Sequence, residues 1–146
     1  LPKGFSWTLF LLWQHSEKKL LPSEQFAAGG YQTVRGYQEN IAVADQGLLF
    51  KTELVSPILK LFNRPNLPEM LQLFTFFDFA DAYHLDKEVI NKKGQILASL
   101  GFGGRYVFRQ NLDLNLSYGW QLQKITQKVS GSAGHSRGHV SLQVSF

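Results

Sequence analysis

Arg35 is the side chain with the clearest chemical potential in this sequence. It lies in the segment GGYQTVRGY, which runs from Gly29 to Tyr37. Its guanidinium is a planar fork of donors, which can bind a carboxylate or a phosphate through two parallel hydrogen bonds. The surrounding glycines disfavour both helix and strand. What Arg35 binds therefore depends on the fold that surrounds this loop, and most loop arginines are simply solvated.

Histidines give a second candidate chemistry, a metal site. His135 and His139 are four residues apart, and His15 and His84 could add ligands. A four-residue spacing brings side chains together on a helix, whereas the sequence around these two residues predicts a loop that passes into a strand. We interpret the four histidines as solvated and predict no metal site.

Acids and glycines give a third set of candidates. Asp78, Asp81 and Asp86 lack the spacing and the bidentate glutamate of a calcium-binding EF-hand loop. The stretch GFGGRY lacks the Lys-Ser/Thr and the following helix of a phosphate-binding loop. Ser23, the histidines and the acids show no ordered catalytic triad. The sequence predicts neither an enzyme nor a cofactor.

Composition narrows the class of protein. The 146 residues suit one domain, and the net charge of +4 comes from scattered basic residues rather than a stripe that would bind nucleic acid. With no cysteine, the sequence offers neither a disulfide framework nor a thiolate metal site. The apolar N-terminal stretch is interrupted by polar residues and has no small-residue cleavage site, so we do not interpret it as a signal peptide. Nowhere do about 18 apolar residues follow one another, as a transmembrane helix would need.

Alternation of apolar and polar residues is the dominant pattern. In LDLNLSYGWQL, leucines and aromatics alternate with Asp, Asn, Ser, Gly and Gln, which predicts a strand with one apolar and one polar face. GHVSLQVSF repeats the pattern, and other runs follow it less strictly. The six predicted strands lie near residues 4–14, 48–56, 70–80, 95–106, 111–122 and 137–146. Most are close to the roughly 9–11 residues of a tilted membrane-spanning strand.

The connections and faces favour a membrane barrel. A very long loop, 15–47, and further long loops alternate with shorter turns, as in outer-membrane barrels. A soluble sandwich or lipocalin-like barrel also alternates, but this many bulky apolar side chains would have to fit its small interior. A polar lumen with a lipid-facing exterior accommodates both faces. The sequence predicts an all-β, antiparallel transmembrane β-barrel.

The long loop carries a motif that resembles a known family. The segment LLPSEQFAAGGYQTVRGYQEN resembles the hallmark loop of two-partner-secretion transporters of the TpsB type (ShlB/FhaC/HecB-like), which are related to BamA. Residues in three further stretches match family motifs, although Ala80 stands where glycine is usual. The matching residues are Pro22, Ser23, Phe26, Gly29, Gly30, Val34, Arg35, Gly36, Tyr37, Gly47, Glu53, Leu54, Pro57, Phe76, Asp78 and Phe146.

The resemblance implies an architecture for the chain. Such transporters have periplasmic POTRA domains before a barrel of sixteen strands, so the chain matches the last six strands of an expected sixteen, without POTRA domains. The long loop between the first two of these would enter the lumen. Because open strand edges in lipid leave backbone groups unpaired, we expect a fragment of a larger protein. The terminal Phe146 would be the signal read by the barrel-assembly machinery.

The resemblance also implies a partner for Arg35. Val34, Arg35, Gly36 and Tyr37 would form the tip of the loop inside the lumen, and Gly29 and Gly30 would permit its tight turn. Asp78 matches the family's partner for the arginine, and its strand parity points it to the polar side. Glu53 is a second inward carboxylate that could share the interaction.

The implied function is protein export. The resemblance predicts a pore in the outer membrane, in contact with its lipid, that exports a large partner exoprotein such as an adhesin or cytolysin. A BamA- or TamA-like assembly factor is the alternative within transport. Outside it, a passive porin or surface adhesin and a soluble ligand-binding β-barrel remain open.

Overall fold

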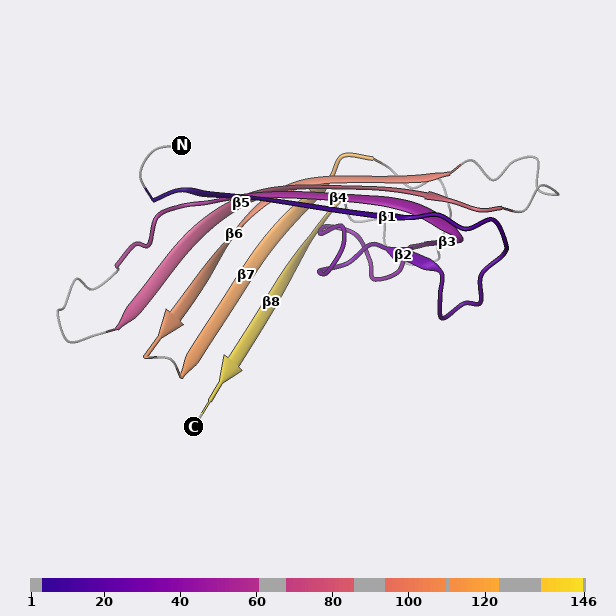
Figure 1. Cartoon of the computed structure of the whole chain (residues 1–146). Helices are drawn as coiled ribbons and strands as arrows, with labels where there is room; N and C mark the ends of the chain where they lie inside the picture. Colours follow the sequence, from indigo (N-terminus) through magenta and orange to yellow (C-terminus); the bar gives the residue numbers. More distant parts are fainter. Residues whose placement is uncertain (1–3, 61–67, 86–93, 110, 124–134, 146) are drawn as a thin grey trace.

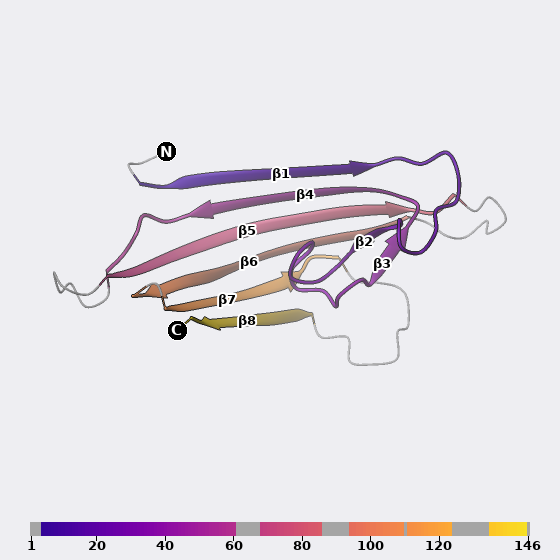
Figure 2. The same ribbon diagram turned by 60° about the horizontal axis from the view of Figure 1, so that its bottom comes forward.

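The computed structural model describes residues 4–60, 68–85, 94–109, 111–123 and 135–145. Its main element is one antiparallel sheet in the order β1-β4-β5-β6-β7-β8, shown in Figures 1 and 2. In chain order, each strand of this sheet pairs with the next one, and the loop region between β1 and β4 contains β2 and β3. The strands are β1 (Ser6–Gln14), β4 (Gln46–Val55), β5 (Glu69–Tyr83), β6 (Gln95–Phe108), β7 (Leu112–Gln121) and β8 (Ser136–Val144).

The described residues are thus all-β and antiparallel, as the alternation indicates. Within them no helix is long and apolar enough to cross a membrane. Strands β5 and β6 have 15 and 14 residues and are longer than expected. The reason is that pairing continues past the recognisable alternation, out to Ala82 with Gln95 at one end and Glu69 with Phe108 at the other. Among the described residues, β1 and β8 are edge strands.

The stretch between β1 and β4 is not irregular throughout, which corrects the expectation of a continuous loop over 15–47. It contains two short strands, β2 (Phe26–Ala28) and β3 (Ala42–Ala44), which pair antiparallel. Three residues are too few for an alternation signal, so the sequence does not predict this hairpin. In Figures 1 and 2 both strands lie against one side of the curved sheet, near the end of β5.

The two faces of the sheet differ in what covers them. One face, which we call the outer face, is apolar and largely exposed. Because residues paired across antiparallel strands share a face, its side chains are read from the register. Its exposed members include Trp7, Leu9, Leu11, Trp13, Leu54, Leu73, Leu100, Phe102, Leu116, Tyr118, Trp120, Val140, Leu142 and Val144.

The opposite, inner face carries the loop between β1 and β4. A small buried core forms where the β2–β3 hairpin meets β4, β5 and β6. Small residues dominate the contact, so two layers of backbone approach closely. Its members are Phe26, Ala28, Val34, Tyr37, Ala42, Ala44, Leu49, Ala80, Ala82 and Leu97. Ala80 is fully buried in this core, which explains why only a small side chain is accommodated there.

Candidate functional site

Residues 29–41, which we call the loop tip, turn back on themselves beyond the β2–β3 hairpin. Gly29, Gly30 and Gly36 all have positive φ angles, of 107°, 102° and 93°. Side chains other than glycine rarely adopt this conformation. The Gly30 N–H donates to the Val34 carbonyl at 3.1 Å, and the Asn40 N–H donates to the Gly29 carbonyl at 3.2 Å. The glycines thus allow a compact tip that presents Arg35 to the sheet.

Arg35 is bound by Asp78 of β5. Its Nε donates to Asp78 Oδ2 at 2.7 Å and its Nη2 donates to Oδ1 at 2.9 Å, which is a two-point fork. The backbone N–H of Arg35 also donates to Oδ2, at 3.1 Å. Asp78 is fully buried and Arg35 is 6 % exposed. A charged pair removed from water in this way is strongly directional, and each member needs the other.

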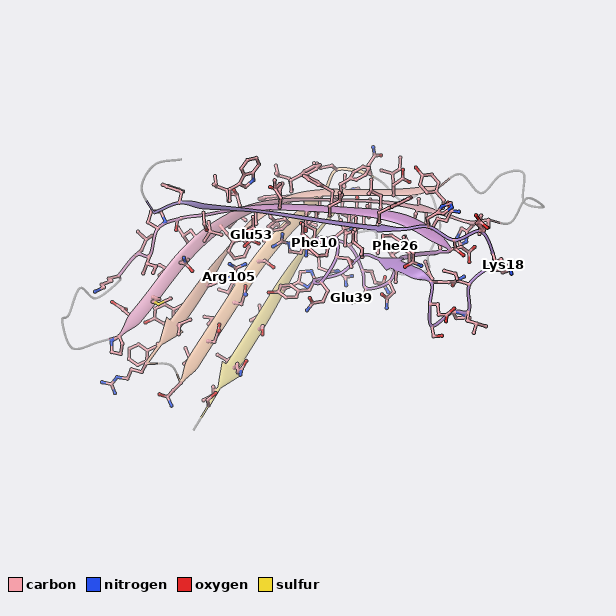
Figure 3. The ribbon with its side chains drawn as sticks, viewed as in Figure 1. Phe10, Lys18, Phe26, Glu39, Glu53 and Arg105 are labelled. Atoms are coloured by element: carbon pink, nitrogen blue, oxygen red, sulfur yellow. The ribbon has the colours of Figure 1, made fainter. Side chains whose placement is uncertain are left out.

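Glu53 of β4 extends this pair into a row of alternating charges. Arg35 Nη1 donates to Glu53 Oε2 at 2.8 Å, and Arg105 of β6 donates to Glu53 Oε1 at 2.5 Å. Figure 3 shows Glu53 and Arg105 on the sheet close to one another. The row therefore runs Asp78, Arg35, Glu53, Arg105 across three strands. Three of these residues belong to the sheet and only Arg35 belongs to the loop.

Two phenylalanines form the floor beneath the arginines. The guanidinium carbon of Arg35 is 3.6 Å from the ring centre of Phe76, and that of Arg105 is 4.6 Å from that of Phe74. Both contacts are cation–π interactions. A Cβ on Gly101 would lie 2.3 Å from the Phe76 ring. Gly101, the first glycine of the GFGGRY stretch, therefore provides room for the ring on which Arg35 rests.

Electrostatics keep Arg35 charged in this position. Burial alone lowers the pKa of an arginine, because it disfavours the charged form. Here the neighbouring carboxylates of Asp78 and then Glu53 more than offset burial, so the pKa of Arg35 lies above its usual value. The arginine acts as a permanent cation, and the arrangement offers binding rather than proton transfer.

Tyr37 forms a second attachment of the tip. Its side chain is fully buried, and its hydroxyl lies 2.9 Å from the Ala98 carbonyl and 2.7 Å from the Gln123 carbonyl. The N–H groups of Ala98 and Gln123 donate to the same hydroxyl at 3.3 Å each. Burial is the main cause that raises the pKa of Tyr37. The neutral hydroxyl thus joins the tip to β6 and to the residues that follow β7.

Gly36 meets β7 backbone against backbone. A Cβ on Gly36 would lie 3.0 Å from the Gly119 carbonyl oxygen, and a Cβ on Gly119 would lie 3.1 Å from the backbone of Arg35. Gln121 of the same strand donates its amide N–H to the Gly36 carbonyl at 2.7 Å. Neither side tolerates a side chain without a shift. Gly119 and Gln121 were not predicted, since only the register of β6 and β7 places them under the tip.

Lys51 of β4 makes a further contact with the tip. Its Nζ donates to the Gln32 carbonyl at 2.8 Å. Lys51 and Arg35 line a cavity of about 360 Å³ together with Thr8, Phe10, Gln32, Thr52 and Glu53. Phe10, labelled in Figure 3, belongs to β1. The cavity therefore lies between the tip and the first strand of the chain.

Other candidates from the sequence are not brought together. His15 stacks on Trp13 and His139 contacts the ring of Tyr31. In the part of the chain that the structure describes, no group of three His, Cys, Asp or Glu residues could hold a metal ion. Asp81 contacts the hydroxyl of Tyr83. Asp86 and Phe146 lie outside the described residues.

A curved antiparallel sheet, apolar outside and charged inside with a loop fastened to its inner wall, is typical of strand-built membrane proteins. Residues 2–106 match the model of the haemolysin secretion/activation protein family ShlB/FhaC/HecB. The chain is also 31 % identical over 107 residues to the heme/hemopexin transporter protein HuxB of Haemophilus influenzae. The match covers 70 % of this chain and 18 % of HuxB.

The chain belongs to the ShlB/FhaC/HecB family. Members of this family are transporters of two-partner secretion in the outer membrane of Gram-negative bacteria. Alternation left both a membrane barrel and a soluble ligand-binding barrel open. The outer-membrane location of the family excludes the soluble barrel. The chain spans less than a fifth of the length of HuxB.

Proposed function

We propose that these residues form part of an outer-membrane pore that exports a large partner exoprotein, an adhesin or a cytolysin. Family membership and the likeness to HuxB, whose name describes a heme/hemopexin transporter, support this proposal. The contact between Arg35 and Asp78 is the observation that carries it. A loop fastened to an inner wall by a buried ion pair suits a pore that must be closed at rest.

The sheet would form the last six strands of a sixteen-stranded barrel. Its outer face would contact lipid, because hydrocarbon accepts exposed apolar side chains and excludes unpaired backbone groups. The edge strands β1 and β8 would pair with strands outside this chain. Phe146 as an assembly signal remains a prediction.

The loop tip would act as the movable part of the pore. At rest Arg35 holds it on β5 through Asp78 and on β4 through Glu53. An unfolded client would thread the lumen as the tip leaves the wall, and folding of the client outside would supply direction, since the periplasm offers no nucleotide. After passage, Arg35 would return to the same carboxylates.

The test uses the full-length transporter, expressed in an outer membrane with a candidate partner exoprotein. We expect the exoprotein in the medium only when the transporter is present. A matched culture lacking the transporter should retain it in the periplasm. If the exoprotein stays inside even when the transporter is present, and other barrel proteins fall in amount in the culture that lacks it, the protein is an assembly factor and export is not its function.

A further inference from the structure

Asp45 lies at the opposite end of the loop from Arg35, and its burial is nearly as complete as that of Asp78. It is 2 % exposed, just before β4 begins. Its Oδ1 accepts the Leu20 N–H at 3.0 Å and the Gln25 amide at 3.2 Å, and its Oδ2 accepts the Leu85 N–H at 3.2 Å. One carboxylate thus joins the start of the loop, the end of the loop and the residues after β5.

These bonds favour the ionised carboxylate. The hydrogen bond from Leu20 is the largest cause that lowers the pKa of Asp45, and the bonds from Leu85 and Gln25 lower it further. A charged acid at the end of the loop that accepts from the start of the loop and from the residues after β5 fixes these three segments in one arrangement. Removing an acceptor would leave a partly buried N–H without its bond, which is costly.

The neighbouring contacts reinforce this attachment. We use the name loop base for residues 20–28 and 42–45. The ring of Phe26 covers Gly47, where an added Cβ would lie 2.2 Å from the ring. Gln46 donates to the Ser16 carbonyl at 2.6 Å, and Gln14 donates to the Glu24 carbonyl at 2.9 Å. The loop base is therefore held by packing and by hydrogen bonds at the root of the loop.

The tip and the base differ in the kind of attachment. The tip carries the ion pairs of Arg35 and follows Gly29 and Gly30, both with positive φ, while its Val34 and Tyr37 also reach the buried core. The base meets the sheet through the apolar side chains of Phe26, Ala28, Ala42 and Ala44. Ion pairs can be exchanged for water or for other charges, whereas the apolar contact has no such replacement.

We infer that Asp45 is a positioning residue that keeps the loop base on the wall while the loop tip moves. The inference rests on the proposed function, which requires the tip to leave the wall during export. It adds a division of the loop: residues 29–41 move, and the β2–β3 hairpin stays. A fixed base would return Arg35 to the same carboxylates after each passage.

Two wall residues report separately on the tip and the base. Ser99 is fully buried and pairs with Asp78 on one side and Gln121 on the other, both of which contact the tip. Ala82 is 2 % exposed and belongs to the core under the base. The chain has no cysteine. Ser99→Cys and Ala82→Cys can thus be introduced singly into a full-length transporter whose other cysteines, where there are any, are replaced.

The experiment measures labelling of each thiol by a membrane-impermeant maleimide, with and without export of the partner. We expect export to increase the labelling rate of Ser99→Cys at least severalfold and to leave Ala82→Cys protected. Adding Asp45→Asn should raise the labelling rate of Ala82→Cys severalfold. Adding Gln25→Ala, which removes one donor to Asp45, should raise this rate less. Asp113→Asn, a change at an exposed acid of β7, serves as the matched control.

The outcomes separate the two claims. Equal labelling of both thiols during export, with Asp45 intact, would show that the whole loop leaves the wall. This result would overturn the role of Asp45 but not the proposed function. Protection of both thiols while the partner reaches the medium would contradict the moving loop of the proposed function. Should Asp45→Asn fail to reach the membrane, Gln25→Ala still decides, because unchanged protection of Ala82→Cys in that variant would count against the carboxylate as the anchor.

Discussion

At the scale of the residue, one arginine is held by geometry that its loop alone could not provide. Arg35 binds Asp78 through two side-chain donors and its backbone N–H, while Glu53 occupies the remaining nitrogen. A lysine at this position would offer a single point charge instead of a planar fork. The row continues to Arg105, so Glu53 keeps a cation even when Arg35 is absent. This arrangement fits a contact that is made and broken.

Tyr37→Phe tests the second attachment of the tip. The change removes a buried hydroxyl and leaves backbone groups of Ala98 and Gln123 without that contact. We expect a loss of about 1–3 kcal/mol in the free energy of unfolding, measured by denaturant titration of the full-length protein in detergent. Tyr31→Phe, at a partly buried ring that contacts His139, is the control. Equal effects of the two changes would show that the Tyr37 hydroxyl contributes nothing specific.

Sequence reasoning reached some of these residues and missed others for a physical reason. The parity of Asp78 and Glu53 along their strands indicates that they share a face, and the family motif adds the arginine. Gly119 and Phe76 were not assigned roles at the tip, because their contacts depend on the register between strands. The Tyr37 contacts depend on where β7 ends. A single sequence without pairing information carries no signal for either.

At the scale of the element, strand alternation predicted the main sheet well. The positions of β1, β7 and β8 follow from their apolar parity, since one face of each strand is exposed and apolar. The β2–β3 hairpin could not be predicted, because its three-residue strands consist mostly of alanine and show no period. Its stability comes from contact with the sheet, so the signal lies in the tertiary structure.

The glycines of β6 make a prediction at this scale. Gly101→Ala would place a Cβ 2.3 Å from the Phe76 ring and 2.2 Å from the Tyr118 carbonyl, so the ring beneath Arg35 and the strand pairing must both shift. We expect a cost of about 1–3 kcal/mol and faster proteolysis of the loop. At Gly104 the nearest atom is 3.5 Å from an added Cβ, and Gly104→Ala should change little. The comparison uses limited proteolysis of the full-length protein, and similar rates for the two variants would contradict the role assigned to Phe76.

At the scale of the whole molecule, the two faces of the sheet assign two environments. The outer face exposes leucines, valines and aromatics from all six strands of the main sheet, and these side chains would contact lipid in the proposed barrel. The inner face carries the charges and the loop. The family decides where such a sheet resides. The alternation of residues predicted the polarity of the faces, whereas it carries no information on the strands that would complete the proposed barrel.

Val140→Arg tests the outer face. Val140 is in the middle of β8 and 73 % exposed, on the side that we assign to lipid. An arginine near the midplane of a bilayer costs about 2–4 kcal/mol, which urea titration of the full-length protein in phospholipid vesicles would measure. Ser141→Arg, one residue away on the inner face, should cost less. The assignment of the faces is wrong if Ser141→Arg destabilises the protein more than Val140→Arg does.

The most direct test of the central claim is a charge exchange between loop and wall, read as the amount of partner exoprotein that the full-length transporter releases. Breaking a buried pair by changing one member costs about 3–5 kcal/mol, so Arg35→Asp and Asp78→Arg should each reduce secretion strongly. Arg137→Asp, at an exposed site in β8, is the control. We predict that the double variant Arg35→Asp/Asp78→Arg recovers part of the secretion, incompletely because the carboxylate introduced into the loop would face Glu53. A double variant that secretes no more than either single variant would contradict the pairing of Arg35 with Asp78 as the contact that positions the loop.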